Sequence, residues 1–457
     1  MQSNHAKEHQ HRNDVEFSNS MKLNSAKQAA YQFALAKHLS VCHPPENTSL
    51  ANELCRLVAL YDDCKDIPST TLTKQLSEYT KHKSDVFDED AKAYIFSCVE
   101  RYQRGIPIHI GRLLKCQSRI ERFKADHDEL LELGLIYIDQ NQEITIEDPT
   151  PYLLPSEWSK WPKSKNGSLS VERVQLQHVP VALAQKLYRA LSFYRYRSLL
   201  RFNVNHRGMH FDYPNPFAAS SGREAPKGGS FIYLPKDARH YLLKPPKGKK
   251  IITLDWCSQE PASLAALAGD TELWNAYLKG DLYTELQRRS KLFSDLDRKQ
   301  FKVLCISHLY GCTPRGIAKK FRVTPTVATV WDNELKRIFF KVNQYLDHKV
   351  NEARSLGYAE VTGFKRTITA DTKQTSIRNF FVQAICARML RLLCIKLNQL
   401  QIPLIFAIHD AIGIEADIDG INTEIIAKQA MADVSESVLG SGFQLLSERE
   451  DEVSTPH

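Results

Sequence analysis

The amino-acid sequence predicts an α+β fold, because it combines long segments of helical hydrophobic spacing with three segments of strand type. Residues 22–102 carry apolar side chains at helical intervals, as in "SLANELCRLVALYDDC". The β-branched run Ile251–Leu254 is typical of a buried strand that leads into a helix. Towards the C-terminus, "IPLIFAI", "HD" and "AIGIEA" follow one another as a strand, a polar tip and a second strand.

The chain is long enough for one large enzyme or for two to four ordinary domains. It has 457 residues, of which 42% are hydrophobic and 25% charged, as in a globular protein that buries a core. The formal net charge of +8 and the pI of about 8.8 favour an acidic partner, with nucleic acid as the first candidate. Charge alone is equally compatible with a mildly basic protein that binds no such partner.

Cysteine usage favours a reducing, cytoplasmic compartment. The ten cysteines form no C-x-x-C pair and no cluster with zinc-ligand spacing. Cys305, Cys386 and Cys394 lie in apolar helical patterns, where buried free thiols are expected. No stretch approaches the roughly 18 consecutive apolar residues of a membrane span. The polar start of the chain lacks the apolar core of a signal peptide and is expected to be a solvated tail.

Two basic runs are candidates for contact with a phosphate backbone. Residues 101–124 contain seven Lys or Arg and one Glu, and residues 186–207 contain six Lys or Arg, no acid and five aromatics. Cations neutralise phosphates while aromatic faces stack on bases. Either run alone is equally compatible with a solvated helix face, but the two together favour nucleic acid.

The segment "KKIITLDWCSQEPASLAALAGD" carries the first candidate catalytic carboxylate. Asp255 is expected at the end of the strand, with Ser258 as the N-cap of the next helix and Pro261 in its first turn. A carboxylate at such a junction is a common metal ligand, although an Asp there more often caps a turn.

The segment "RKQFKVLCISHLYGCTPRGIAKKF" predicts a helix with a functional face. Arg298, Lys302, Ile306 and Tyr310 recur every four residues and form one stripe that ends before Gly311. Such a stripe could hold a polyphosphate at its cationic end and a flat base at its aromatic end. An ordinary amphipathic helix with solvated cations is the alternative.

The segment "FAIHDAIGIEA" places Asp410 at the tip of a hairpin. Burying a carboxylate without a partner is costly, so Asp410 needs a neighbour. Two Asp residues from separate strand ends are the minimal set for two-metal phosphoryl transfer, in which each bridges divalent cations. Asp255 and Asp410 are therefore the candidate pair.

Taken in order, these segments resemble the family A DNA polymerases, the DNA polymerase I family. "LDWCSQEPASLAALAGD" resembles motif A, with Asp255 as the metal-binding Asp and Glu260 five residues further on. "RKQFKVLCISHLYG" resembles motif B, and "IHDA" resembles motif C. Four further stretches resemble family segments: "SSGREAP", "RNFFVQA", "GYAEVTGFKR" and "RYQRGIPIHI". The resemblance covers the chain from about residue 100 to the C-terminus.

The resemblance implies a right-hand polymerase fold, with an antiparallel sheet in the palm and helical fingers and thumb. The implied ranges are a disordered tail at 1–21, a helical N-terminal region at 22–95 that is at most a remnant of an exonuclease domain, a thumb at 96–205, a palm at 206–268 and 371–457, and fingers at 269–370.

The resemblance also implies a role for each site residue. The catalytic set is Asp255, Asp410 and Lys302, in which Lys302 is the general acid for pyrophosphate departure. Two Mg²⁺ ions would be held by Asp255, Asp410 and the backbone carbonyl of Trp256. The nucleotide-binding set is Arg298, Lys302, Ile306, Tyr310, Glu260, Gln259 and Tyr283, where Glu260 blocks a ribose 2′-hydroxyl. The primer–template set is Arg223, Asn379, Gln383 and His409.

The sequence departs from the family pattern at four positions. Ala411 stands where many members have the motif C Glu, and Ile306 stands where motif B usually has Phe or Tyr. Tyr283 replaces a common phosphate-binding His. Thr375 occupies an Arg position, with Arg378 one residue before Asn379.

The predicted function is a template-directed, magnesium-dependent DNA polymerase without 3′–5′ proofreading. Roughly 95 residues precede the thumb, too few for a full exonuclease domain, and no D-x-E follows an apolar strand there. The expected partners are primer–template DNA, deoxynucleoside triphosphates and, through residues 1–95, replication accessory proteins. The alternatives are a single-subunit RNA polymerase-like enzyme and a catalytically weak DNA-binding accessory protein.

Overall fold

A computed structural model of the chain describes residues 89–140, 142–164, 167–212, 216–226 and 229–454. The predicted tail at 1–21 and all but the last few residues of the predicted region 22–95 lie outside the described residues. Within the described part, no helix is long and apolar enough to cross a membrane. The cysteines of this part are all free thiols, and Cys305, Cys386 and Cys394 are buried, as predicted.

The chain divides into two compact units. The described residues of unit 1 come from 89–105, 216–226 and 247–454, and those of unit 2 come from 106–212 and 229–246. Most of the predicted thumb range, 96–205, lies in unit 2, but its first turns of helix lie in unit 1. Residues 229–246, predicted as palm, lie in unit 2 because their helix packs against the long helix that begins at Ile110.

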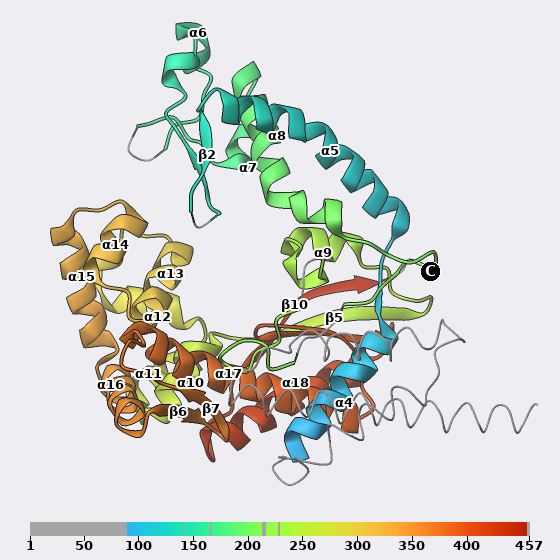
Figure 1. The fold of residues 1–457 in the computed structure, drawn as a ribbon, viewed down its shortest axis with the longest axis vertical. Coiled ribbons are helices and arrows are strands. Elements are labelled where there is room, and N and C mark those ends of the chain that lie inside the picture. Colours follow the sequence, from blue (N-terminus) through green and yellow to red (C-terminus); the bar gives the residue numbers. More distant parts are fainter. Residues whose placement is uncertain (1–88, 141, 165–166, 213–215, 227–228, 455–457) are drawn as a thin grey trace, which may run out of the picture. The chain divides into compact units, whose positions relative to one another are not determined.

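Unit 2 is built on two long helices, α5 (Ile110–Glu132) and α8 (Ala182–Tyr196), that pack against each other (Figure 1). Leu130 and Leu187 lie in the core between them. The other elements of the unit are β1 (Ile106–Pro107), β2 (Ile136–Ile138), β3 (Ile144–Ile146), η1 (Thr150–Tyr152), α6 (Pro155–Trp158), α7 (Arg173–Leu176), η2 (Arg197–Arg201), β4 (Met209–His210), η3 (Phe231–Tyr233) and α9 (Lys236–Leu242).

The two basic runs of the sequence differ in how far their cations are already paired. Arg119 on α5 is exposed to solvent. On α8, Lys186 lies 2.6 Å from Glu129, and Arg189 lies 2.6 Å from Asp126, both on α5. Ion pairs within unit 2 therefore engage part of the second run, which leaves it fewer cations for phosphate than its composition suggests.

Unit 1 centres on a four-stranded antiparallel sheet in the order β10-β5-β9-β8. The predicted strand–tip–strand is confirmed, because β8 and β9 pair across a tip formed by His409 and Asp410. The edge strand β10 comes from the C-terminal end of the chain, and its register shifts between Arg449 and Asp451. The strands are β5 (Lys249–Trp256), β8 (Leu404–Ile408), β9 (Ala411–Asp417) and β10 (Ser447–Ser454).

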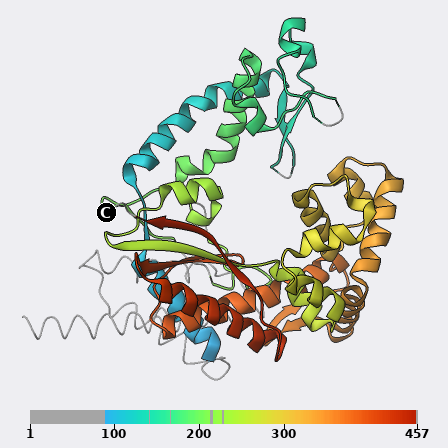
Figure 2. The same cartoon turned by 180° about the vertical axis from the view of Figure 1, so that it is seen from behind.

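Three helices pack against this sheet: α4 (Glu89–Arg104), α17 (Gln374–Gln399) and α18 (Ile421–Leu439) (Figure 2). The buried Trp256 points to α18, where its indole N–H donates to the carbonyl of Met431 at 3.3 Å. Because side chains alternate between the two faces of a strand, Asp255 lies on the face opposite to Trp256.

The segment between β5 and β8 is mainly helical. The predicted helix at Arg298 is confirmed, and Asp297 caps it in a capping box with Gln300. The elements are α10 (Gln259–Leu267), α11 (Thr271–Leu278), α12 (Leu282–Arg289), η4 (Lys291–Phe293), α13 (Arg298–Leu309), α14 (Pro314–Phe321), α15 (Pro325–Ile338), α16 (Phe340–Leu356), β6 (Tyr358–Val361) and β7 (Phe364–Thr367).

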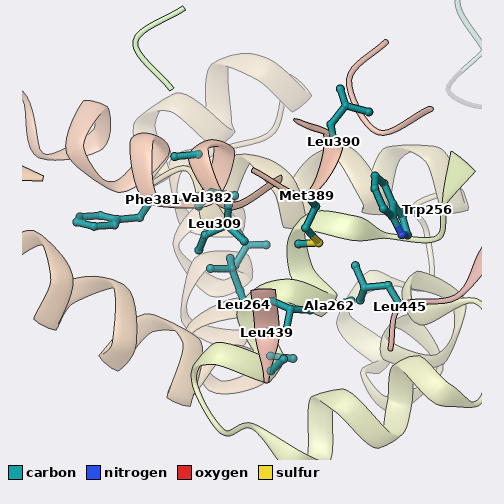
Figure 3. Close-up of a cluster of buried hydrophobic side chains, with 14 of the residues drawn as sticks. Trp256, Ala262, Leu264, Leu309, Phe381, Val382, Met389, Leu390, Leu439 and Leu445 are labelled. Atoms are coloured by element: carbon teal, nitrogen blue, oxygen red, sulfur yellow. The ribbon is translucent and has the colours of Figure 1, made fainter. Parts of the chain in front are cut away.

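One continuous core joins the sheet to these helices. Trp256 of β5, Leu264 of α10, Leu309 of α13 and Met389 of α17 belong to the same buried cluster (Figure 3). Protein cores are packed at crystal-like density, so elements that share one resist relative movement. The core therefore fixes the end of β5 relative to α10 and α13.

Candidate active site

The hairpin tip brings Asp410 beside Asp255, which lies 155 residues earlier in the sequence. Asp255 pairs in register with Ala411, the residue that follows Asp410. The main-chain N–H of Trp256 donates to the carbonyl of Asp410 at 3.3 Å. The two predicted carboxylates thus lie together at one end of the sheet.

Burial and mutual repulsion make this pair of carboxylates hard to ionise. Burial raises the pKa of the Asp255 carboxyl to about 8, and the charge of Asp410 is the next cause. Glu450 and Glu448 of β10 raise that pKa further, whereas Lys302 lowers it. Burial also raises the pKa of Asp410. The metal-free site is therefore short of positive charge.

The donor atoms at this site fit a divalent cation. Oδ1 of Asp255 is buried and accepts no hydrogen bond from the described residues. Mg²⁺ prefers carboxylate oxygens, and a cation between Asp255 and Asp410 would remove both the unpaired oxygen and the repulsion. Within the described ranges, no three His, Cys, Asp or Glu side chains are already gathered in metal-binding geometry. The carbonyl of Trp256 as a ligand stays a prediction.

Backbone strain flanks both carboxylates. Ser258 has φ 47° and His409 has φ 56°, in the left-handed region that non-glycine residues rarely occupy. Each such residue costs about 1–2 kcal/mol. Ser258 precedes α10 as predicted, but its side chain makes no capping hydrogen bond. Strain that the surrounding structure maintains is typical of functional sites.

The cationic half of the α13 stripe faces the carboxylates and a further acid. The exposed Lys302 lowers the pKa of both Asp255 and Asp410. Arg298 binds Asp281 with two hydrogen bonds, from Nε at 2.7 Å and from a terminal nitrogen at 2.6 Å. The Arg298 guanidinium is the main reason that the pKa of Asp281 falls to about 2.

Tyr283 and Ile306 are less exposed than Arg298 and Lys302, the two cations of the stripe. The Tyr283 ring is 1% exposed and lies 5.9 Å from the Arg298 guanidinium and 5.7 Å from the Lys302 ammonium. Ile306 is half-buried and packs against the core. The Tyr283 ring therefore lies within cation–π distance of both α13 cations.

A second polar cluster joins the end of α13 to α10 and α17. The hydroxyl of Tyr310 donates to Oε1 of Glu260 at 2.6 Å. The side-chain amide of Gln383 donates to the Tyr310 oxygen at 3.4 Å, and Arg223 lies 3.5 Å from Glu260. Burial, followed by the charge of Glu260, raises the pKa of Tyr310. Four of the predicted site residues thus form one cluster.

Several predicted contact residues hold buried polar atoms that no described residue satisfies. These atoms are both amide atoms of Gln259, Oδ1 of Asn379 and Nε of Arg223. A buried polar group without a partner costs about 1–3 kcal/mol. Such atoms are available to a ligand that can exchange hydrogen bonds with them. His409, in contrast, is exposed at the hairpin tip.

Sequence reasoning gave Arg378 no role, yet it organises the packing around Gly311. Its Nε donates to the Leu309 carbonyl at 2.8 Å, and the guanidinium binds Asn343 and Asp347. Gly311 has φ +82°, and a Cβ there would lie 3.3 Å from the Arg378 side chain. Arg378 therefore holds the end of α13 against α16 and α17.

Two acids near the site, Asp281 and Glu448, were also not predicted from the sequence. Asp281 is the N-cap of α12, a position typical of Asp, and nothing local signals its ion pair with Arg298. Glu448 lies in the charged stretch "SEREDE", which is typical of a solvated strand edge. Only the three-dimensional pairing of β10 with β5 places it beside Asp255.

Comparison with solved structures identifies the class of fold. The POL domain of Pol1 from M. smegmatis, in complex with a DNA primer–template and dNTP, superposes with a TM-score of 0.66. The match covers 91% of this chain and 80% of that chain, at 18% sequence identity. It confirms the predicted α+β fold of the right-hand polymerases.

Comparison of sequences identifies the family. The model of the family described as DNA polymerase family A matches residues 233–439. The chain is 25% identical to DNA polymerase I of Caldicellulosiruptor bescii over 213 residues, 41% of this chain and 25% of that protein. It is 23% identical to DNA polymerase I of Chloroflexus aurantiacus over 312 residues, 60% of this chain and 32% of that protein. The matches thus span about a quarter to a third of these relatives. The part of the chain at residues 233–439 is thus the part that matches the family A DNA polymerase domain.

Proposed function

We propose that the chain is a template-directed DNA polymerase that adds deoxynucleotides to a primer 3′ end by two-metal phosphoryl transfer. The observation that carries the proposal is the adjacency of Asp255 and Asp410 at one end of the sheet, where Lys302 lowers the pKa of both. In phosphoryl transfer, negative charge spreads over the phosphoryl oxygens, so fixed cations and metal ligands supply most of the catalysis. The family A domain supports the same reaction.

The residues of the site divide the work by their chemistry. Two Mg²⁺ ions, held by Asp255, Asp410 and the Trp256 carbonyl, would activate the primer hydroxyl and neutralise the triphosphate. Lys302 is the candidate general acid for the pyrophosphate oxygen, since it is an exposed cation on the side of the carboxylates. Arg298 binds triphosphate oxygens after it exchanges Asp281 for them.

The cluster around Tyr310 selects the nucleotide and meets the DNA. Glu260, fixed by the Tyr310 hydroxyl, excludes a ribose 2′-hydroxyl, while the Tyr310 ring packs near the templating base and Ile306 near the incoming nucleotide. Gln259 offers its unsatisfied amide to the nucleotide. The primer and template are bound by Arg223, Asn379, Gln383 and His409, of which the first two have buried polar atoms to satisfy.

An RNA polymerase-like enzyme is the first rival, and Glu260 argues against it. The test is extension of a primer on a defined template with deoxy- or ribonucleotides in separate reactions. We expect templated addition of deoxynucleotides only. Efficient addition of ribonucleotides would favour the rival.

A DNA-binding accessory protein with little catalytic activity is the second rival, motivated by Ala411, Ile306 and Tyr283. We expect extension that depends on Mg²⁺, whereas tight binding of primer–template without extension would favour this rival. A primer with a mismatched 3′ end tests the proposed lack of proofreading, since a polymerase without exonuclease activity extends that primer slowly and does not trim it.

A further inference from the structure

The edge strand β10 places Glu448 directly beside Asp255. Asp255 pairs in register with Glu448 on one side and with Ala411 on the other. Cross-strand partners present their side chains on the same face of the sheet, so Glu448 shares the face of Asp255, opposite to Trp256. Like charges directly opposite each other destabilise a strand pair. This pairing of two acids therefore indicates that a cation offsets the repulsion.

The side chain of Glu448 is not engaged by the rest of the described fold. Glu448 is exposed and forms no ion pair or hydrogen bond with the described residues. Since it stands directly opposite Asp255 in the strand register, its carboxylate is available on the face of the sheet that carries Asp255.

Two other charged residues of β10, Arg449 and Glu452, form ion pairs away from Asp255. Arg449 binds Glu424 of α18 and lies 2.7 Å from Glu452. Glu452 also lies 3.6 Å from Lys250. Glu450 lies between Arg449 and Asp451, where the register shifts, and therefore does not stand directly opposite Asp255. The register thus singles out Glu448.

We propose that Glu448 is the third carboxylate of the metal site and positions the cation by accepting a hydrogen bond from a metal-bound water. Mg²⁺ usually keeps several of its waters, so an acid one shell out can hold it. Ala411 leaves the other flank of Asp255 without a carboxylate. Because three acids do not already converge among the described residues, the contact runs through water and not through direct ligation. This inference rests on the proposed function of Asp255 and Asp410.

The test measures binding of Mn²⁺ to the whole chain by electron paramagnetic resonance, without DNA or nucleotide. The variants are Glu448→Gln, the control Glu452→Gln, which removes the same charge from the same strand, and Asp410→Asn. We expect about tenfold weaker binding for Glu448→Gln, because outer-shell partners typically change metal affinity 10–100-fold. Binding by Glu452→Gln should equal that of the wild type, and Asp410→Asn should lose the site.

Thermal unfolding gives a second readout. It separates weaker metal binding from a variant that simply fails to fold. In EDTA, Glu448→Gln should unfold at a temperature at least as high as that of the wild type, since it removes one of two acids that face each other across the strand pair. Added Mn²⁺ should then stabilise it less than it stabilises the wild type. If Glu448→Gln binds Mn²⁺ as tightly as the wild type while Asp410→Asn does not bind it, the role of Glu448 is overturned and the proposed function is not. Absence of any Mn²⁺ site in the wild type would overturn the proposed function as well.

Discussion

The hydroxyl of Tyr310 donates to Oε1 of Glu260 at 2.6 Å, which ties the end of α13 to the first turn of α10. Glu260 lies five residues after Asp255, so this hydrogen bond fixes a carboxylate next to the end of β5 that carries Asp255. A carboxylate held by a half-buried tyrosine has little freedom to move away from a bulkier sugar.

Replacing Glu260 by Ala should relax the choice of sugar. The Glu260→Ala variant should raise the ratio of ribonucleotide to deoxynucleotide incorporation by about 10–100-fold, the range over which one pocket group discriminates. The ratio is measured as kcat/KM for each nucleotide on the same primer–template. Tyr310→Phe, which keeps the ring but loses the donor, should give a smaller change. An unchanged ratio in Glu260→Ala would exclude Glu260 as the residue that selects the sugar.

The metal-free protein should lose stability as pH rises from about 4 to about 8. The pKa of Asp255 is about 8 in the folded state, above the ordinary value of 3.8, so within that window the folded state binds the proton that the unfolded state has released. Asp255→Asn should remove this slope. In EDTA, its gain in unfolding free energy over the wild type should be larger at pH 8 than at pH 6, by of order 1–2 kcal/mol. Urea unfolding at the two pH values measures it, and equal gains would contradict a raised pKa.

Asp281 should restrain Arg298 until nucleotide binds. Asp281→Asn keeps an N-cap for α12 but removes the ion pair, so stability should change by less than about 1 kcal/mol. The freed Arg298 should lower the KM for deoxynucleotides, whereas Arg298→Ala should raise it. Steady-state kinetics of both variants measures these KM values. A raised KM in Asp281→Asn would instead mean that the ion pair positions Arg298 for the triphosphate. Because the pKa of Asp281 is lowered to about 2, the ion pair should be present above about pH 4 and should be lost as pH falls through about 2.

Position 413 requires glycine, because the Phe406 ring leaves no room for a side chain there. Phe406 is its cross-strand partner, and a Cβ on Gly413 would lie 2.3 Å from the Phe406 ring. Gly413→Ala should therefore destabilise the hairpin that carries Asp410 by about 1–3 kcal/mol, the usual cost of overpacking. Urea unfolding measures the loss, and a second replacement, Phe406→Leu, should recover part of it. Full stability of Gly413→Ala alone would show that the ring can move aside.

Sequence patterns were sufficient for the elements that hold the carboxylates. The strand before Asp255, the helix at Arg298 and the hairpin around Asp410 each follow from local periodicity and turn chemistry, and all are present. Local signals work here because the hairpin strands are continuous buried apolar runs, and because the helix has apolar side chains at helical spacing. The assignment of roles to these residues came from the family resemblance.

The parts that sequence could not supply depend on contacts between distant segments. The pairing of Glu448 with Asp255 is set by the packing of the C-terminal strand and by the register shift after Arg449, neither of which has a local signature. The second basic run looked free for phosphate because its partners Glu129 and Asp126 lie on another helix. Contacts between distant segments therefore determine which charged side chains are free to bind a metal ion or phosphate.

The most direct test of the account is primer extension by Asp410→Ala in Mg²⁺, compared with the wild type and with Asp255→Ala. The wild type should add the deoxynucleotide that the template specifies. Each variant should be slower by a factor on the order of 1,000 or more, because each removes a proposed ligand of the catalytic metals. Circular dichroism and primer–template binding of the variants should match the wild type. Templated extension at the wild-type rate by either variant would contradict a mechanism centred on Asp255 and Asp410.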